Sequence, residues 1–464
     1  MTMIAFLLVI LPFVFSYLLG HLLLALLFRN DRKLDSLTHF FLAGGLGLGM
    51  SSIISFYSFL ITDLFNKIFV LSVHALLLFS FCCILLLQKK KPSSLLNKGA
   101  PESKIKSLLF FVFLSVLFIP VWIQSKFYPM GGWDAWSVWN FKAKFLFLSM
   151  GEWKNLFDVR LWRTSPHYPL LLPLINIWGW TFAKSPSSFV PQLTSVVFTF
   201  LVAGLLFSTL KSFTKNAFSL FAPLLLITLP FYNTLATSQY CDIVLSYYCL
   251  ASVYCLIMTI HLNKSSYAFL AGVFTGMLAF TKPEGLIASL LLLAIGLTQF
   301  LLFERKKIQL KTKRAPLLFL SLGALLAFLP SIFFKSFCSP GNQTFINGFM
   351  SESNPVSLYR LKMIFAFLLL ELKSGKWNGI WILLVLGLVL SKGRCFSKTT
   401  SLIPFFAFTY VTVVLFYYFL NTYFLIDWWL SVTLSRILFS LLPILLFWMF
   451  ASLWKGDKKI RKNG

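Results

Sequence analysis

Residues 3–28 read MIAFLLVILPFVFSYLLGHLLLALLF and contain no charged side chain. A helix needs about 20 consecutive apolar residues to cross the hydrocarbon core of a bilayer, and this stretch supplies them. It has neither a basic n-region nor an A-x-A cleavage site, so we expect a retained helix and not a cleaved signal. Over all 464 residues, 58% are hydrophobic and 12% are charged, whereas a soluble domain carries roughly 25% charged residues. The sequence therefore predicts an all-α integral membrane protein.

Similar apolar stretches along the chain predict a bundle of about 13 transmembrane helices. They are residues 3–28, 38–61, 68–88, 107–124, 189–210, 217–236, 242–262, 266–281, 285–303, 315–335, 377–391, 400–420 and 437–454. Because Lys and Arg collect in cytoplasmic loops, the N-terminus is predicted outside and the C-terminus inside. The inner loops then hold 26 of the 41 basic residues and five acids, against 15 basic residues and nine acids outside. These inner loops are 29–37, 89–106, 211–216, 263–265, 304–314, 392–399 and 455–464.

The formal net charge of +27 indicates this loop bias and contact with anionic membrane lipids. We therefore expect membrane lipids as partners and no nucleic acid. The seven cysteines show no paired spacing, so neither a disulfide framework nor a zinc site is expected.

Two apolar stretches, 169–183 and 361–372, are too short to cross the membrane. If either one alone were counted as a span, every later basic loop would move to the outer side. We expect both to be helices that lie in or dip into the outer interface. The main extramembrane feature is then one large outer loop, 125–188. Smaller outer segments cover 336–376 and 421–435.

The outer loop contains GGWDAWSVWNFKAK, in which Asp134 lies beside Trp133 and Trp136. Tryptophans at a membrane boundary are often anchors. A carboxylate among them is partly desolvated, which raises its basicity and suits it to general-base catalysis. His167, in SPHYPLLLP, is either a polar interface residue or a metal ligand or acceptor partner.

Three later segments place ionisable groups at the same outer boundary. Asp242 opens a span, where it could cap the helix or serve the reaction. Lys282 and Glu284, in AFTKPEGL, could neutralise each other or bind substrate. Arg436 could reach lipid head groups or grip a phosphate with two parallel hydrogen bonds. Carboxylates with Lys and Arg on one membrane face suit a lipid-phosphate substrate.

These residues resemble the membrane glycosyltransferases of the GT-C fold. The similar group is the protein O-mannosyltransferase, aminoarabinose transferase and RgtA/B/C/D-like branch. The matching elements are Asp134 after a span, His167-Tyr168-Pro169, Asp242 at a helix start, Thr281-Lys282-Pro283-Glu284-Gly285 and Leu434-Ser435-Arg436. Tyr168 stands where that group has the first proline of a His-Pro-Pro pattern, and no second acid adjoins Asp134.

The resemblance covers about residues 107–454 as a GT-C-like core, with 1–106 as three additional helices and 455–464 as a basic cytoplasmic tail. It implies transfer of a sugar from a polyprenyl-phosphate donor to an acceptor hydroxyl, amine or phosphate on a glycan, lipid or protein. The expected place is a bacterial inner membrane with the active site on the periplasmic side, and the expected outcome is inversion at the sugar.

The resemblance also suggests roles for the residues. Asp134 would be the general base, and Lys282 and Arg436 would stabilise the departing phosphate. Asp242 and His167 would orient the acceptor or hold a possible divalent metal ion. The remaining substrate contacts would come from Glu284, Trp133 and Tyr168.

Two other classes stay open. Asp242, Lys282 and Glu284 could form an ion-binding cluster of a multi-pass transporter or lipid-linked sugar flippase. The chain could also be an inactive structural partner that keeps the fold. Cleavage of a polyprenyl-phosphate sugar distinguishes the enzyme from both.

Overall fold

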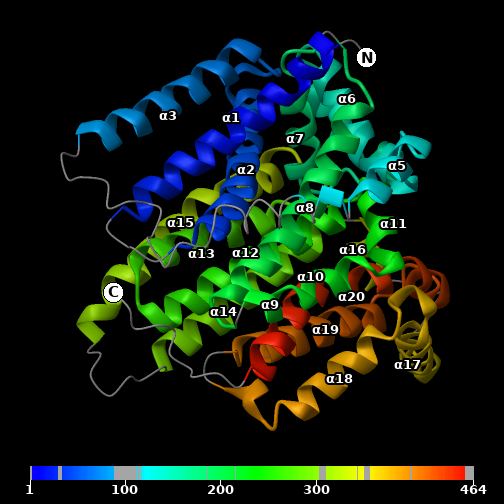
Figure 1. The fold of residues 1–464 in the computed structure, drawn as a ribbon. Helices are drawn as coiled ribbons and strands as arrows, with labels where there is room; N and C mark the ends of the chain where they lie inside the picture. The colour runs from blue at the N-terminus through cyan, green and yellow to red at the C-terminus, as the bar shows by residue number, and fades with distance from the viewer. Residues whose placement is uncertain are drawn as a thin grey trace.

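The structure is a computed structural model that describes residues 3–29, 34–87, 112, 115–116, 118–183, 185–214, 216–302, 310–341, 343–349, 356–397 and 400–454. These residues form helices and connecting turns, with no strand among them (Figure 1). The first half contains α1 (Met3–Leu27), α2 (Ser36–Thr62), α3 (Lys67–Leu87), α5 (Ile119–Phe127), η1 (Ala135–Trp139), α6 (Asn140–Leu148), η2 (Trp153–Phe157), η3 (Val159–Thr164), α7 (Leu171–Gly179), α8 (Phe189–Lys211) and α9 (Asn216–Ser219). The second half contains α10 (Phe221–Ile227), α11 (Pro230–Ser238), α12 (Cys241–Leu262), α13 (Ser265–Ala279), α14 (Pro283–Leu302), α15 (Leu310–Phe337), α16 (Gln343–Gly348), α17 (Leu358–Lys373), η4 (Gly375–Trp377), α18 (Ile380–Leu390), η5 (Arg394–Phe396), α19 (Leu402–Leu420) and α20 (Ile426–Leu453).

The predicted all-α membrane fold is confirmed. Nine helices of the described chain are long and apolar enough to cross a membrane, or ten if one bent pair is counted. These nine coincide with nine of the predicted spans, from 3–28 to 437–454. The other four differ: 217–236 is the bent pair, 266–281 and 377–391 are helices of 15 and 11 residues, and 107–124 lies partly outside the described residues.

The bend in 217–236 has a local cause. Pro230 begins α11 and has no backbone N–H to continue the hydrogen-bond pattern of α10. Leu229 before it is extended, with ψ 126°, as the residue before a proline prefers. The two helices are therefore bent by 68°.

The last helix begins earlier than expected. Residues 421–435 were predicted as an outer segment, but α20 starts at Ile426 and includes both Asp427 and Arg436. These two charges lower the hydropathy of 426–436, so the sequence does not indicate that the span begins there. Since Arg436 is paired with carboxylates, its charge does not prevent helical packing.

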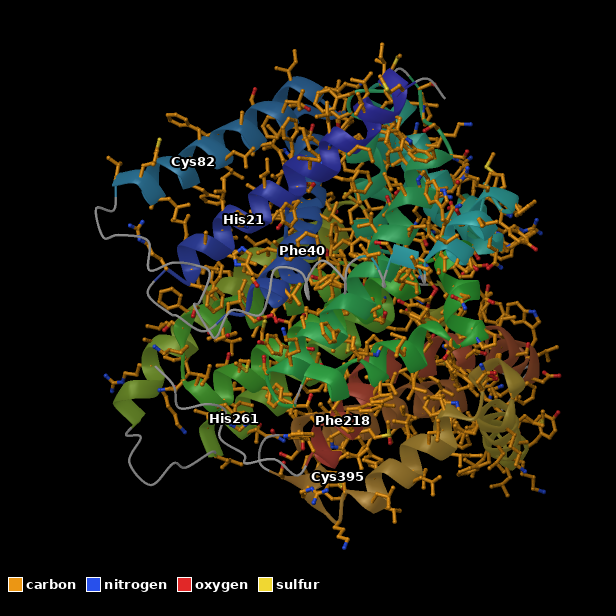
Figure 2. All side chains as sticks on the ribbon, in the orientation of Figure 1. His21, Phe40, Cys82, Phe218, His261 and Cys395 are labelled. Atoms are coloured by element: carbon orange, nitrogen blue, oxygen red, sulfur yellow. The ribbon has the colours of Figure 1, made fainter. Side chains whose placement is uncertain are left out.

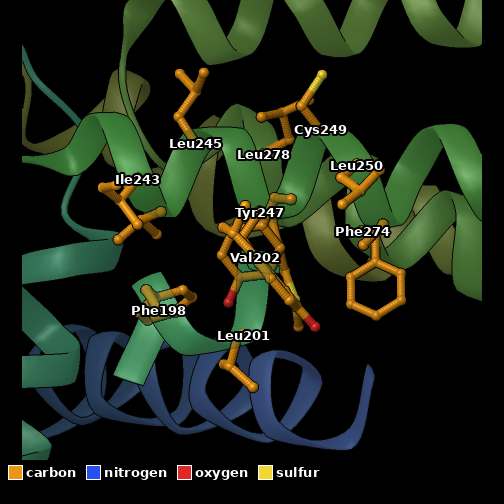
Figure 3. Close-up of a cluster of buried hydrophobic side chains, with 14 of the residues drawn as sticks. Phe198, Leu201, Val202, Ile243, Leu245, Tyr247, Cys249, Leu250, Phe274 and Leu278 are labelled. Carbon is orange, nitrogen blue, oxygen red and sulfur yellow. The ribbon is translucent and has the colours of Figure 1, made fainter. Parts of the chain in front are cut away.

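Helix α12 is the centre of the bundle, and its most apolar stretch is completely buried. Figure 3 shows Tyr247 and Leu250 of α12 packed with Val202 of α8 and Phe274 of α13. Helices α13 and α15 approach very closely, because a Cβ at Gly272 would lie 2.3 Å from the backbone oxygen of Leu320.

Helix α7 lies within 169–183, the stretch predicted to form a helix that lies in or dips into the outer interface. All nine of its residues are buried, because α1, α2, α6 and α8 pack around it. Trp178 of α7 stacks on His74 of α3 with ring centroids 4.0 Å apart, and its indole N–H donates to Ser16 of α1 at 2.8 Å. The N-terminal helices therefore enclose part of the outer loop. The other short stretch, 361–372, lies within α17.

All seven cysteines are free thiols. Cys82 of α3 and Cys395 of η5 lie on opposite sides of the molecule (Figure 2).

Candidate active site

Five predicted residues form one chain of alternating charge. Arg436 contacts Asp134 through Nη1 at 2.5 Å and Asp242 through Nη2 at 2.9 Å and Nε at 3.0 Å. Lys282 Nζ donates to the other oxygen of Asp242 at 3.1 Å and lies 3.7 Å from Glu284. The order is Asp134, Arg436, Asp242, Lys282, Glu284. Residues separated by up to 302 positions thus share one site.

Asp134 is placed by a tight turn. Gly131 has φ +70°, which glycine adopts without strain, and the N–H of Gly132 donates to the carbonyl of Ser238 at 3.0 Å. Asp134 follows and leads into η1, a single π-helical turn. Such turns are frequent at functional sites. The turn therefore fixes Asp134 against the start of α12.

Three of the other four charges come from helix ends, and the fourth, Arg436, comes from within a helix. Asp242 lies in the first turn of α12, where the helix dipole favours a carboxylate. Lys282 precedes α14 and Glu284 lies in its first turn. Arg436 lies ten residues after the start of α20. All four therefore converge at the outer end predicted for these helices.

Burial varies along this chain of charges. The side chain of Asp242 is 3% exposed, whereas that of Asp134 is 29% exposed. Burial alone would lower the pKa of Lys282, but the charges of Asp242 and Glu284 outweigh it and raise that pKa above its ordinary value. Lys282 therefore stays protonated, as a group that binds an anion must.

The three carboxylates are not equivalent. Both oxygens of Asp242 accept from cations, so this group is held rather than reactive. Asp134 is bound through Oδ2 only, and no donor of the described chain reaches its Oδ1. Oε2 of Glu284 is buried and has no hydrogen-bond partner among the residues that the structure describes. Asp134 is the most accessible of the three, and it has an oxygen available to take a proton.

A metal ion at Asp242 does not suit this arrangement, because the ion would have to displace Lys282 or Arg436. The described residues contain no group of three or more His, Cys, Asp or Glu side chains placed to hold a metal. A divalent ion held by Asp242 and His167 remains a prediction.

His167 and Tyr168 lie on a turn beside this site. Burial, aided by the charge of Lys142, lowers the pKa of His167 to about 4. Burial and the charge of Glu284 raise the pKa of Tyr168 well above its usual value, and the charges of Asp134, Asp242 and Arg436 also reach it. Tyr168 is therefore near enough to these charges for them to act on its hydroxyl.

Trp133 stays at the surface. Its side chain is 67% exposed, and it meets Trp136 edge-on with ring centroids 4.5 Å apart. No contact joins Trp133 directly to the five charges among the described residues. Trp133 lies beside the site because it directly precedes Asp134 in the chain.

Sequence reasoning missed two residues here. The ring of Tyr240 lies 4.7 Å from the guanidinium of Arg436, and its hydroxyl accepts from the backbone N–H of Asp134 at 3.4 Å. Lys142 is fully buried beside Tyr168. Tyr240 could have been suspected from its place two residues before Asp242. Lys142 resembled an ordinary loop lysine.

Comparison with known proteins gives a family match for part of the chain. Residues 169–334 match the family model described as dolichyl-phosphate-mannose-protein mannosyltransferase. The matched range includes Asp242, Lys282 and Glu284, while Asp134 and Arg436 lie outside it. No curated protein and no solved structure matches the chain. Together with the all-helical membrane fold, this match over part of the chain supports a membrane glycosyltransferase of the GT-C type.

Proposed function

We propose that the protein moves a sugar from a polyprenyl-phosphate donor to an acceptor at the outer face of the membrane, with inversion of the anomeric carbon. The observation that carries the proposal is the buried series of charges that ends at Asp134. It combines one accessible carboxylate with two cations held a few ångströms away. Those are the groups that this displacement requires.

Asp134 is the proposed general base. The acceptor oxygen attacks C1 of the sugar, its proton passes to Asp134, and the bond from C1 to the phosphate oxygen breaks. Arg436 holds one oxygen of Asp134 and so orients the carboxylate. A single displacement forms no covalent sugar–enzyme intermediate, so the configuration at C1 inverts. The second product is polyprenyl phosphate.

Lys282 and Arg436 are the proposed phosphate contacts. Each guanidinium nitrogen of Arg436 already contacts a carboxylate, but the group has five N–H donors and Lys282 has three. Donors therefore remain for the phosphate oxygens. Asp242 touches both cations, and this supports a role in holding them in place in addition to the acceptor role implied by the resemblance.

The remaining proposed contacts with the substrates follow from which side-chain groups are available to bind them. Glu284 has a buried oxygen without a partner, which suits it to accept from a sugar hydroxyl. Tyr168 and His167 line the approach to the charges, with His167 neutral at physiological pH. Trp133 presents an exposed ring beside Asp134 for the acceptor.

The test uses purified protein in lipid nanodiscs with a labelled polyprenyl-phosphate sugar. Release of polyprenyl phosphate and labelling of the acceptor are both measured. Asp134→Asn should reduce turnover by about 10²–10⁴ while donor binding persists, because only the proton acceptor is lost.

Asp158→Asn is the matched control, since Asp158 lies in the same outer loop and also pairs with an arginine, Arg160, but contacts none of the five charges of the site. This control should keep its activity. Near-normal turnover in Asp134→Asn would contradict the assigned base. Movement of the labelled lipid between leaflets without cleavage would instead indicate a transporter.

A further inference from the structure

Lys142 is a lysine buried in the outer loop without an acidic partner. Its side chain is 0% exposed on α6, and no carboxylate of the described chain lies within ion-pair distance. Lysine is almost never fully buried unless it is paired. Burial lowers the pKa of its amine well below the ordinary value. A feature this costly requires a structural or functional reason.

The amine of Lys142 holds one particular turn. Nζ donates to the backbone oxygens of Ser165 at 2.6 Å and Tyr168 at 3.1 Å, and it lies 5.7 Å from the centre of the Tyr168 ring. Ser165 has φ +50°, a conformation that is unfavourable for residues other than glycine. Two hydrogen bonds from Lys142 therefore fix a turn that would otherwise relax.

This turn connects both halves of the site. Lys142 lies eight residues after Asp134, on the helix that continues directly from η1. Beyond Tyr168, the N–H of Leu171 donates to the carbonyl of Phe280 at 3.2 Å, two residues before Lys282. Lys142 thus bridges the segment that carries Asp134 and the segment that leads to the Lys282 turn.

We propose that Lys142 is a positioning residue that sets Tyr168 against the charged site by holding the Ser165–Tyr168 turn. The inference rests on the proposed transferase function. Lys142 touches neither donor nor acceptor, and its effect passes through Tyr168. Loss of the amine should let the turn move and leave the charged residues themselves in place.

The test is a double-mutant cycle with the labelled donor. Lys142→Met keeps the length and apolar stem of the side chain but removes the donors, and Tyr168→Ala removes the ring. Each variant alone should lower kcat/KM by at least about tenfold. In Lys142→Met two buried carbonyls lose their hydrogen-bond donor, and in Tyr168→Ala the aromatic ring itself is lost. The double variant should be no more than about twofold below the worse single variant, because coupled residues are not additive. The backbone amides of Ser165, His167 and Tyr168 should exchange hydrogen faster in Lys142→Met.

Lys313→Met is the matched control. Lys313 is 5% exposed and donates to the carbonyls of Phe300 and Leu301 at 2.9 Å each, far from the five charges in sequence. This control should lower the melting temperature but leave the turnover of folded protein unchanged.

The outcomes are distinguishable. Wild-type protein that releases no polyprenyl phosphate would contradict the proposed function, while hydrogen exchange would still report on the turn. With active wild-type protein, full activity in Lys142→Met or Tyr168→Ala, or strictly additive losses, would overturn the role of Lys142. Unchanged exchange at 165–168 would overturn it as well.

Discussion

Arg436 determines what the neighbouring carboxylates can do. By contacting Asp134 and Asp242 at once, it joins an accessible carboxylate to a buried one. The sequence placed these residues at one boundary because hydropathy and charge bias assign sides. It could not predict their pairing, because Arg436 is 194 residues from Asp242 and 302 from Asp134. Such pairings depend on tertiary packing.

Arg436→Ala should weaken donor binding and slow the reaction together. Removing one charged donor that stabilises the departing phosphate costs about 10²–10³ in rate, so kcat/KM should fall by at least about a hundredfold. Arg436→Lys should recover little, because an ammonium group cannot contact both carboxylates in the plane of a guanidinium. Donor binding and turnover are measured per folded molecule, with the exposed Arg160→Lys as control. Full activity in Arg436→Ala would leave Arg436 as a head-group anchor.

His167 should make stability depend on pH. Its pKa is about 4 in the folded protein, against 6.5 for the free side chain, because burial disfavours the charged ring. Between these values the unfolded state binds more protons, so stability is fully present above pH 6.5 and decreases as the pH falls toward 4. His167→Gln should flatten this part of the dependence of melting temperature on pH. An unchanged slope would show that His167 does not titrate as a buried group.

Short connections between helices, more than the long spans, shape the site. The spans could be predicted because hydrophobic length alone defines them. The π-helical turn η1 and the early start of α20 could not, because each depends on contacts with distant segments. Even the buried α7 resembled a surface helix, since its sequence is as apolar as an interfacial one.

Gly132→Ala should disturb the site without unfolding the bundle. A Cβ at this position would lie 2.4 Å from the hydroxyl of Tyr240, which contacts both Asp134 and Arg436. Tyr240 must then move, and misplacement by about 1 Å can cost up to roughly a hundredfold in rate. Gly375→Ala is the control, because its Cβ would meet nothing within 4 Å. Equal turnover in the two variants would show that Tyr240 does not position the charges.

The side of the membrane that each loop faces remains a prediction, and two hydrogen bonds are compatible with it. Segments predicted on one side contact each other: Trp153 of the outer loop donates to Asp63 at the end of α2 at 2.7 Å. At the opposite end, Arg394 of the predicted inner loop 392–399 donates to the carbonyl of Ser452, near the end of α20, at 3.0 Å. The three N-terminal helices, predicted as additions, pack against α7 and α8. Their status as a separate unit remains a prediction.

Cysteine labelling tests this orientation in intact cells. Positions 98 and 308, both predicted inside, lie outside the described residues, so we choose Lys392, which is exposed in an inner loop. Asn155, in the outer loop, is its counterpart. In a background in which the exposed Cys82 is replaced by serine, Asn155→Cys should react with an impermeant maleimide and Lys392→Cys should not.

Permeabilised cells provide the control, because Lys392→Cys should then label. This result would show that its earlier protection came from the membrane and not from burial in the protein. The reverse pattern in intact cells would place the Asp134 site on the cytoplasmic side. The same charge bias assigned a side of the membrane to every loop. The reverse labelling pattern would therefore also move the predicted donor and acceptor to the other side.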